Sequence, residues 1–429
     1  MEDFFHFFSL SDPNIRYVVL GTVLLTASSA VVGTFTFLQK KSLVGDAVAH
    51  AVLPGVCLAF LLAETKNPLL LIIGAFVTGW LSLLIIDGIT RHSKIKEDTA
   101  IGLVLSVFFG VGILLLTNIQ HGGNAAQSGL DSFLFGKAAA LLPSDVRAFG
   151  FLSILLLLVV AFLYKELKIL CFDKEYALLL GLPVRALELT LTTLTVLAVV
   201  VGIQAVGVVL MAAMLITPAA AARFWTDRLS VMLILATVFG VFSGITGAFI
   251  SYTAPNMPTG PWVVIVISCI AGISFFLAPK KGIAFRLYRQ MDNRRMILDE
   301  NILKAFFQLG EQERNFRHVR VLSDLQNKRH FLPHRLREGL ARLRRQGFLD
   351  REGEGWKLTL AGYEKGKRTV RLHRLWELYL TQYLRIAPDH VHEDAETIEH
   401  VITPELERRL EEKLNFPKLD PHQSEIPYR

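Results

Sequence analysis

The first 278 residues alternate long apolar stretches with short polar connections. A helix needs about 17 to 25 apolar residues to cross the hydrocarbon core of a bilayer. Nine stretches are of this kind: 16–38, 46–63, 68–90, 99–118, 148–164, 186–204, 206–222, 229–251 and 260–278. Pro54-Gly55 predicts a break or kink in the second stretch, and the nearly continuous sixth and seventh are also compatible with a re-entrant pair. The pattern predicts an all-α polytopic membrane domain of about nine transmembrane helices over residues 1–278.

Beyond residue 278 the apolar positions recur at shorter, amphipathic spacings. Residues 279–298 are basic and lack a long apolar run, which is typical of a juxtamembrane linker lying against anionic headgroups. The patterns that follow are helices at 299–309, 321–328 and 332–345, then alternating strands at 347–351 and 356–360. This order predicts a cytoplasmic winged helix-turn-helix domain over 299–370, whose second helix enters the major groove of DNA, followed by a helical domain over 371–429.

The helix predicted at 332–345 carries the candidate DNA-contacting side chains. Its leucines at 336, 340 and 343 form one apolar stripe. The stripe leaves five basic side chains available: His334, Arg335, Arg337, Arg344 and Arg345. Residues 279–376 hold 24 Lys and Arg against 11 Asp and Glu, whereas residues 377–429 hold 6 against 12. The basic part can neutralise phosphates; the alternative is a cationic surface held against the membrane.

Composition and charge exclude a single soluble globule. Only 19% of the residues are charged, against about a quarter in soluble domains. Up to residue 278 the basic and acidic residues balance at 15 each, so the net charge of +7 lies in the C-terminal part. The cations of the short loops fall on alternate connections, and that face is expected to be cytoplasmic. The C-terminal domains are then inside and the N-terminus outside, with no basic segment at Met1 to predict a cleavable signal peptide.

Asp46 and His50 are the candidate metal ligands within the membrane. They lie four residues apart, so a helix places both side chains on one face, one turn apart. Ionisable residues are costly in a membrane and usually functional, and carboxylate and imidazole both bind Mn²⁺, Fe²⁺ and Zn²⁺. The alternative is a helix-end aspartate and a histidine hydrogen-bonded within the bundle. The predicted orientation places the pair toward the cytoplasmic end of its helix.

The connection between the fifth and sixth stretches contains an insert of helical length. Residues 172–183 end in Gly181 and Pro183 and lie on the predicted cytoplasmic face. A short amphipathic helix between two spans can dock into a partner subunit. It can also lie at the lipid interface, and composition alone does not decide between the two.

Histidines and glutamates gather in the acidic C-terminal part. His392, Glu396, Glu399 and His400 have the spacing i, i+4, i+7 and i+8, which places them on one helical face. His373 and Glu377 form a second such pair on the preceding helix. Two histidine–carboxylate faces on adjacent helices suit one or two divalent transition metal ions. Charge-paired surface helices are the alternative.

The N-terminal region resembles the permease subunits of Mn/Zn/Fe ABC importers over about residues 10–280. Three segments carry the resemblance: GDAVAHAVLPG at 45–55, EYA with Gly181 at 175–181, and GVVLMAAMLITPAA at 207–220. The resemblance implies a permease dimer in the bacterial inner membrane, a separate ATPase and an extracytoplasmic metal-binding protein. It also implies that Asp46 and His50 line the metal path. The residues implied to couple to the ATPase are Asp173, Glu175, Ala177 and Gly181.

No Walker A loop, G-x-x-x-x-G-K-[ST], occurs in this chain. The energy source is therefore expected to be another polypeptide. No nucleophile–base arrangement on a Gly-rich turn was found either, so an enzyme is not expected.

Residues 296–429 resemble the diphtheria-toxin-repressor family of metal-sensing transcriptional repressors. The resemblance lies in RLHRLWE at 371–377, VHEDAETIEHV at 391–401 and FPKLDPH at 416–422. It implies that Glu396, Glu399 and His400 are primary-site ligands and that His373, Glu377 and His392 belong to another or a shared site. Glu at 396 resembles the manganese-responding branch. Glu300 matches a further ligand, whereas Leu303 departs from that branch, and the family's SH3-like third domain is not expected.

The sequence therefore predicts a divalent-metal permease fused to a metal-responsive repressor. Metal bound in the C-terminal domain, with Mn²⁺ or Fe²⁺ expected ahead of Zn²⁺, would favour a dimer and binding to operator DNA, giving feedback on uptake. The alternative hypothesis is a C-terminal metal sensor that gates the permease without binding DNA. Loss of His334, Arg335 and Arg337 would harm a repressor and spare a gate.

Overall fold

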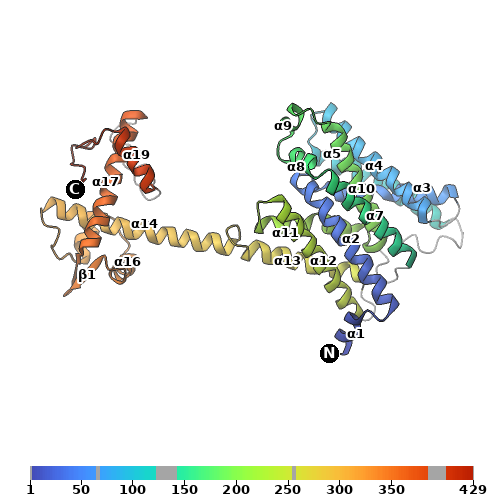
Figure 1. Ribbon diagram of the computed structural model, residues 1–429, viewed down its shortest axis with the longest axis horizontal. Helices are drawn as coiled ribbons and strands as arrows, with labels where there is room; N and C mark the ends of the chain where they lie inside the picture. Colours follow the sequence, from blue (N-terminus) through green and yellow to red (C-terminus); the bar gives the residue numbers. More distant parts are fainter. Residues whose placement is uncertain (1, 64–67, 122–142, 254–257, 385–401, 429) are drawn as a thin grey trace. The chain divides into compact units, whose positions relative to one another are not determined.

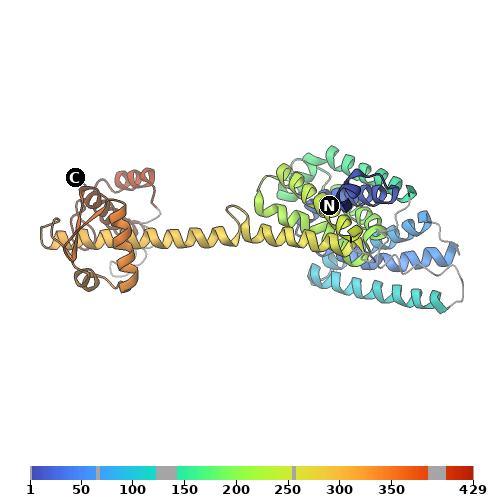
Figure 2. The ribbon, with the colours of Figure 1, turned by 90° about the horizontal axis from the view of Figure 1, so that it is seen from below.

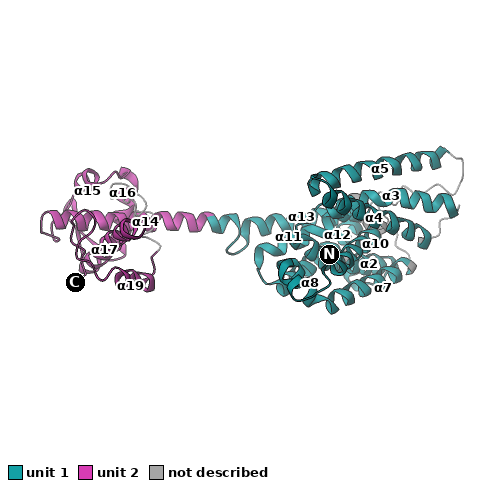
Figure 3. Cartoon of the chain, turned by 90° about the horizontal axis from the view of Figure 1, so that it is seen from above, with its two compact units in different colours: residues 1–286 teal, residues 287–429 magenta. Residues whose placement is uncertain are grey.

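The computed structural model describes residues 2–63, 68–121, 143–253, 258–384 and 402–428. The chain divides into two compact units, residues 1–286 and residues 287–429 (Figure 3). Each unit has hydrophobic cores of its own. They are called below the membrane unit and the C-terminal unit.

The membrane unit is a bundle of helices (Figure 1). Its described helices are α1 (Glu2–Ser9), α2 (Pro13–Leu38), α3 (Val44–Ala63), α4 (Pro68–His92), α5 (Glu97–His121), α7 (Pro143–Phe162), α8 (Tyr164–Phe172), α9 (Lys174–Leu179), α10 (Val184–Val206), α11 (Val208–Trp225), α12 (Leu229–Thr253) and α13 (Thr259–Leu277). Each of the nine predicted apolar stretches is a helix. Among the described residues, eight helices are long and apolar enough to span a membrane, and α11 is a shorter apolar helix. The prediction of an all-α polytopic membrane domain is confirmed.

Of the break or kink predicted at Pro54, the break does not occur, because α3 runs through this residue from Val44 to Ala63; the kink stays a prediction. Proline is tolerated in membrane helices where neighbouring elements satisfy the freed backbone groups. The following residue, Gly55, allows the backbones of α3 and α4 to touch: a Cβ there would lie 2.1 Å from the carbonyl oxygen of Gly74. Helices α3, α4 and α5 run side by side (Figure 1).

Helices α10 and α11 are separate elements. Gly207, with φ +85° and ψ 168°, is the C-cap of α10 and the N-cap of α11. A side chain is strained at this φ, so glycine permits the interruption. α11 packs against α2, α12 and α13. The two stretches therefore form two helices joined at one glycine.

The C-terminal unit contains α14 (Ile283–Gln312), α15 (Leu322–Lys328), α16 (Pro333–Arg345), β1 (Leu349–Glu352), β2 (Gly355–Leu358), α17 (Leu360–Tyr383) and α19 (Pro404–Lys413). The strands form an antiparallel hairpin in which Leu349 pairs with Leu358. Leu325, Leu336 and Leu340 are buried in one core with Ile302 of α14. The order of three helices and a hairpin confirms the predicted winged helix-turn-helix.

Helix α14 is longer than the sequence pattern predicts. The expected helix begins at residue 299, whereas α14 begins at Ile283 (Figure 2). Most of the predicted linker, residues 283–298, is therefore helical and continuous with the first helix of the DNA-binding fold. Leu287, Tyr288 and Met291 are exposed on this segment.

Candidate metal-binding and DNA-contacting sites

Asp46 and His50 lie on the same face of the first part of α3. The His50 Nε2 atom is 3.5 Å from the Asp46 Oδ1 atom, and the side chains are 24% and 44% exposed. The His50 Nδ1 atom is buried and has no hydrogen-bond partner among the described residues. Imidazole and carboxylate are both ligand types that divalent transition metals accept.

Neighbouring helices hold this face of α3 in place. The His50 ring packs edge-to-face on Phe109 of α5, with the ring centroids 5.0 Å apart. Gly112, one turn further along α5, lies against Leu53, and a Cβ there would come within 2.9 Å of the leucine side chain. The orientation of the Asp46–His50 pair is therefore fixed by close packing as well as by the helical spacing.

The predicted coupling insert folds as the short helix α9. Asp173 is its N-cap, and its side chain accepts a hydrogen bond from the Tyr176 backbone N–H at 2.8 Å. Ala177 is buried and anchors the helix, whereas Leu178 and Leu179 are 59% and 85% exposed. An exposed apolar tip of this kind suits docking on another surface, either protein or lipid. Glu175 is exposed, and Gly181 has φ +73°.

His373 and Glu377 form a buried pair on α17. The His373 Nε2 atom is 3.1 Å from the Glu377 Oε1 atom, and both side chains are less than 5% exposed. A buried histidine–carboxylate pair is a donor set that divalent transition metals accept. Within the described part of the chain, no group of three or more histidine, cysteine, aspartate or glutamate residues surrounds a common point.

Glu300 of α14 contacts the helix that carries this pair. Its carboxylate lies 3.3 Å from the Lys365 Nζ atom. Lys365 and His373 are eight residues apart on α17, which corresponds to about 12 Å along the helix axis. The role of Glu300 as a further ligand stays a prediction. The other predicted ligands, His392, Glu396, Glu399 and His400, lie outside the described residues.

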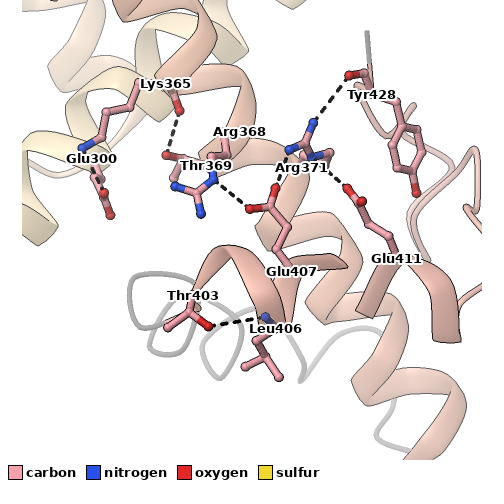
Figure 4. Close-up of polar contacts among 10 residues, drawn as sticks. All are labelled: Glu300, Lys365, Arg368, Thr369, Arg371, Thr403, Leu406, Glu407, Glu411 and Tyr428. Carbon is pink, nitrogen blue, oxygen red and sulfur yellow. Dashed lines mark hydrogen bonds and ion pairs between the residues drawn. The ribbon is translucent and has the colours of Figure 1, made fainter. Parts of the chain in front are cut away.

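An ion-pair cluster joins α17 to α19 and to the chain end (Figure 4). Glu407 of α19 is bonded to Arg368 at 2.8 Å and also to Arg371. Arg371 pairs further with Glu411 and donates to the Tyr428 carbonyl oxygen. Burial raises the pKa of Glu411. The cluster fixes α19 and the chain end against α17, the helix that carries His373 and Glu377.

Arg374 makes a second attachment of α17. Its guanidinium binds both carboxylate oxygens of Glu311 on α14, at 2.9 and 2.6 Å. It also lies 3.5 Å from Asp420 and donates to the Glu425 carbonyl. The side chain is only 8% exposed. Arg374 therefore ties three parts of the C-terminal unit together.

The five predicted DNA-contacting residues are all exposed on α16: His334, Arg335, Arg337, Arg344 and Arg345. Arg342 of the same helix is directed inward, where it donates two hydrogen bonds to Asp299, at 3.1 and 2.7 Å. These bonds raise the pKa of the Arg342 guanidinium. One arginine of α16 thus fastens the helix to α14, and the others remain available.

The hairpin adds residues to this surface that the sequence pattern did not single out. A groove between α16 and the hairpin is lined by Arg337, Arg344 and Arg345 together with Arg351 and Trp356. The Arg351 guanidinium lies over the Trp356 ring at 5.8 Å. The sequence pattern could not single out Arg351, because the burial of this strand does not alternate: Leu349 is buried and the next three residues are all exposed.

Comparison with known proteins agrees with the division of the chain into a membrane unit and a C-terminal unit. The model of the ABC 3 transport family matches residues 11–278, and that of the iron dependent repressor, metal binding and dimerisation domain matches residues 359–428. The manganese transport system membrane protein MntC of Bacillus subtilis is 44% identical over 379 residues, which cover 88% of this chain and 86% of that protein. The zinc transport system membrane protein TroC of Treponema pallidum is 43% identical over 280 residues, or 65% of this chain and 94% of that protein.

A solved structure supports the fold of the membrane unit. PsaBC from Streptococcus pneumoniae, in complex with Fab, has a TM-score of 0.58 and 34% identity, covering 64% of this chain and 96% of that chain. These relatives are membrane transport proteins, which confirms that the chain is a transport subunit and not an enzyme. The chain belongs to the ABC 3 transport family and carries a C-terminal iron-dependent-repressor domain.

Proposed function

We propose that this chain is the permease subunit of an importer for a divalent transition metal, Mn²⁺, Fe²⁺ or Zn²⁺. The observation that carries the proposal is the Asp46–His50 pair on one face of α3, with an imidazole nitrogen that is buried and has no hydrogen-bond partner among the described residues. Relatives described as manganese and zinc transport proteins support this class of cargo. The metal is the transported substrate, and both side chains would bind it in passage.

The permease works with other polypeptides in this proposal. A homodimer or a second permease subunit completes the path, an extracytoplasmic metal-binding protein delivers the ion, and a separate ATPase docks on α9. The exposed leucines of α9 and the residues Asp173, Glu175, Ala177 and Gly181 support a docking role for this segment. The C-terminal unit lies in the cytoplasm of the bacterial cell.

Uptake of metal tests the transport proposal. Cells that express the full-length chain with its partner subunits are expected to accumulate Mn²⁺, Fe²⁺ or Zn²⁺, measured by mass spectrometry. Asp46→Asn and His50→Gln are expected to reduce this uptake about tenfold or more, because changing even a residue that only hydrogen-bonds to a metal ligand costs about 10–100-fold in affinity. His92→Gln, at the exposed end of α4, is the control and should transport normally. Equal uptake by all three variants would refute the role of the pair.

The C-terminal unit is proposed to be a metal-responsive DNA-binding repressor domain. The exposed basic side chains of α16 and the groove with Arg351 support contact with DNA. His373, Glu377, His392, Glu396, Glu399 and His400 would hold the metal, and the buried His373–Glu377 pair fits such an ion. The bound ion would supply positive charge that draws its ligand helices together. Glu300, engaged by Lys365, would have to release that lysine before it joined them.

DNA binding distinguishes this proposal from a sensor that only gates the permease. The purified full-length chain, tested at a fixed salt concentration against DNA from upstream of its own gene, is expected to bind when Mn²⁺ or Fe²⁺ is present and to lose binding with a chelator. Arg335→Ala with Arg337→Ala should abolish binding and spare metal affinity. Arg408→Ala, an exposed arginine of α19, is the matched control. Metal binding without any DNA preference would favour the gate.

The segment 279–298 is proposed to remain against the inner leaflet as a basic helix and turn. It contains six Lys and Arg and one acidic residue, which favours anionic headgroups. Residues 283–298 of this segment belong to α14, which continues into the DNA-binding fold. Cleavage within the segment would release that fold, and DNA binding by the tethered protein is the other option.

A further inference from the structure

A small cavity of about 150 Å³ lies at one end of the membrane unit, where α3 and α5 begin, α4 ends and α10 begins. Its apolar wall comes from Val44, Leu83 and Ile86. Its charged lining residues are Lys41, Asp87, Arg91, Glu97, Arg185 and Glu188. Three cations and three carboxylates balance here, so the cavity gathers structural ion pairs and does not concentrate a ligand of either sign.

Glu188 of α10 is the centre of these ion pairs. Its Oε1 atom is 2.5 Å from the Nζ atom of Lys174, the first residue of α9. Its Oε2 atom is 3.6 Å from the Nη2 atom of Arg91, in the last turn of α4. The Glu188 side chain is 20% exposed, whereas those of Lys174 and Arg91 are 56% and 45% exposed. One half-buried carboxylate thus joins α9 to α4.

Helix α4 in turn is packed against the helix that carries the candidate metal ligands. At Gly55 and Gly74 the backbones of α3 and α4 are so close that a Cβ on Gly74 would lie 2.4 Å from the Gly55 carbonyl oxygen. Val48 and Val52 of α3 are packed against Gly79 of α4. Contacts as close as these allow little relative movement of the two helices, because packed interiors have low compressibility and transmit strain. A displacement of α4 is therefore carried to α3.

We propose that Glu188 is a positioning residue that couples movement of α9 to α4 and so to Asp46 and His50 on α3. This inference rests on the proposed function, in which the ATPase docks on α9. ATP-driven displacement of α9 pulls Lys174; Glu188 passes the displacement to Arg91, and α4 moves α3. Without the link, the ATPase still docks and hydrolyses ATP, but the metal path no longer follows it.

The ratio of metal transported to ATP hydrolysed tests this coupling. The full-length chain, reconstituted in proteoliposomes with its ATPase subunit and supplied with the extracytoplasmic metal-binding protein loaded with Mn²⁺, is assayed for uptake and hydrolysis in the same vesicles. Glu188→Gln is expected to lower the ratio by about fivefold or more, the lower limit of typical coupling between two sites. A defect in docking would lower both rates together and leave the ratio unchanged.

Asp87→Asn is the matched control. Asp87 also binds Arg91, with its Oδ1 atom 2.8 Å from the Nε atom, but among the described residues no hydrogen bond or ion pair joins Asp87 to α9. Its variant should keep the ratio of the original protein. Lys174→Met removes the link from the α9 side at an exposed residue and should lower the ratio as Glu188→Gln does. Because both changes break one link, the double variant should be no worse than either single variant.

Two outcomes would overturn the inference. One is an unchanged ratio in Glu188→Gln or Lys174→Met, and the other is an additive loss in the double variant. Absence of Mn²⁺, Fe²⁺ and Zn²⁺ uptake by the original protein would instead refute the proposed function on which the inference rests. Thermal unfolding of each purified variant shows whether it is folded, and a poorly folded Glu188→Gln leaves Lys174→Met to decide.

Discussion

The two units differ in the kind of polar side chain that they bury. In the described part of the membrane unit, every buried polar side chain is a serine or threonine, such as Ser28, Thr36 and Thr195. In the C-terminal unit, most buried polar residues are ionisable, and they include His373, Arg374, Glu377 and Glu407. A hydroxyl can return its hydrogen bond to its own helix backbone, whereas a buried charge needs a partner that lies elsewhere in the fold.

The difference teaches what holds each unit together. Membrane helices gain little from the hydrophobic effect against one another, so they rely on small residues and close backbone approach. The contacts at Gly55–Gly74 and at Gly33, where a Cβ would lie 1.7 Å from the Leu215 carbonyl oxygen, are of this kind. The C-terminal unit joins its helices through arginines, such as Arg371 and Arg374.

The largest effect is expected at Arg374. Replacing it with alanine leaves the Asp420 carboxylate, which is only 4% exposed, without this partner, and breaking such a buried pair costs about 3 to 5 kcal/mol. Thermal or denaturant unfolding of the full-length chain, followed by a probe in the C-terminal unit, measures the loss. Arg408→Ala is the control, since Arg408 is 72% exposed and an exposed pair contributes at most about 1 kcal/mol. Equal losses would remove the distinction between the units.

The second effect concerns close packing in the membrane unit. Gly55→Ala places a Cβ against the Gly74 carbonyl and is expected to destabilise the α3–α4 contact by about 1 to 3 kcal/mol, as overpacking does. Detergent or thermal unfolding of the purified protein measures it. Gly88→Ala, on α4 with open space around the added carbon, should be neutral or slightly stabilising. A tolerated Gly55→Ala would show that the helices can separate at little cost.

Tyr428 provides a test by pH. Its hydroxyl is buried with no hydrogen-bond partner among the described residues, and burial raises its pKa to about 12 from 10. The unfolded tyrosine ionises first as the pH rises, so stability is complete below pH 10 and is lost as the pH approaches 12. The unfolding midpoint of Tyr428→Phe should depend less on pH over this window. Identical pH profiles would contradict a buried hydroxyl.

The smallest effect is expected for a membrane hydroxyl. The Thr36 and Thr195 hydroxyls are 3.1 Å apart between α2 and α10, and each also bonds its own helix. Thr36→Val should cost about 0.6 kcal/mol, the average for such bonds in a membrane protein. Thr237→Val is the control, because the Thr237 hydroxyl donates to the Leu233 carbonyl of its own helix and to no other helix among the described residues. A loss above about 2 kcal/mol at Thr36 would contradict the smaller contribution expected of a membrane hydroxyl compared with the buried Arg374.

Much of the fold followed from the sequence. The nine apolar stretches, the winged helix-turn-helix and the exposure of Arg335 and Arg337 were all predicted correctly, because apolar periodicity reports which face of an element is buried. The break at Pro54 was wrong, because proline's effect depends on what neighbours supply to the backbone. The start of α14 was also missed, because exposed basic and apolar residues give little local signal of where a helix begins.

For the candidate sites, too, some contacts could be predicted from the sequence and others could not. Helical spacing alone placed Asp46 beside His50 and His373 beside Glu377, because residues four apart share a helix face. Residue type and spacing did not show that Lys365 engages Glu300, that Arg342 turns inward to Asp299, or that Glu188 joins α9 to α4. Those partners lie 43 or more residues apart in the first two cases and on three separate helices in the last. The choice of partner for a long charged side chain is decided by which helices pack together, and only the tertiary structure determines that.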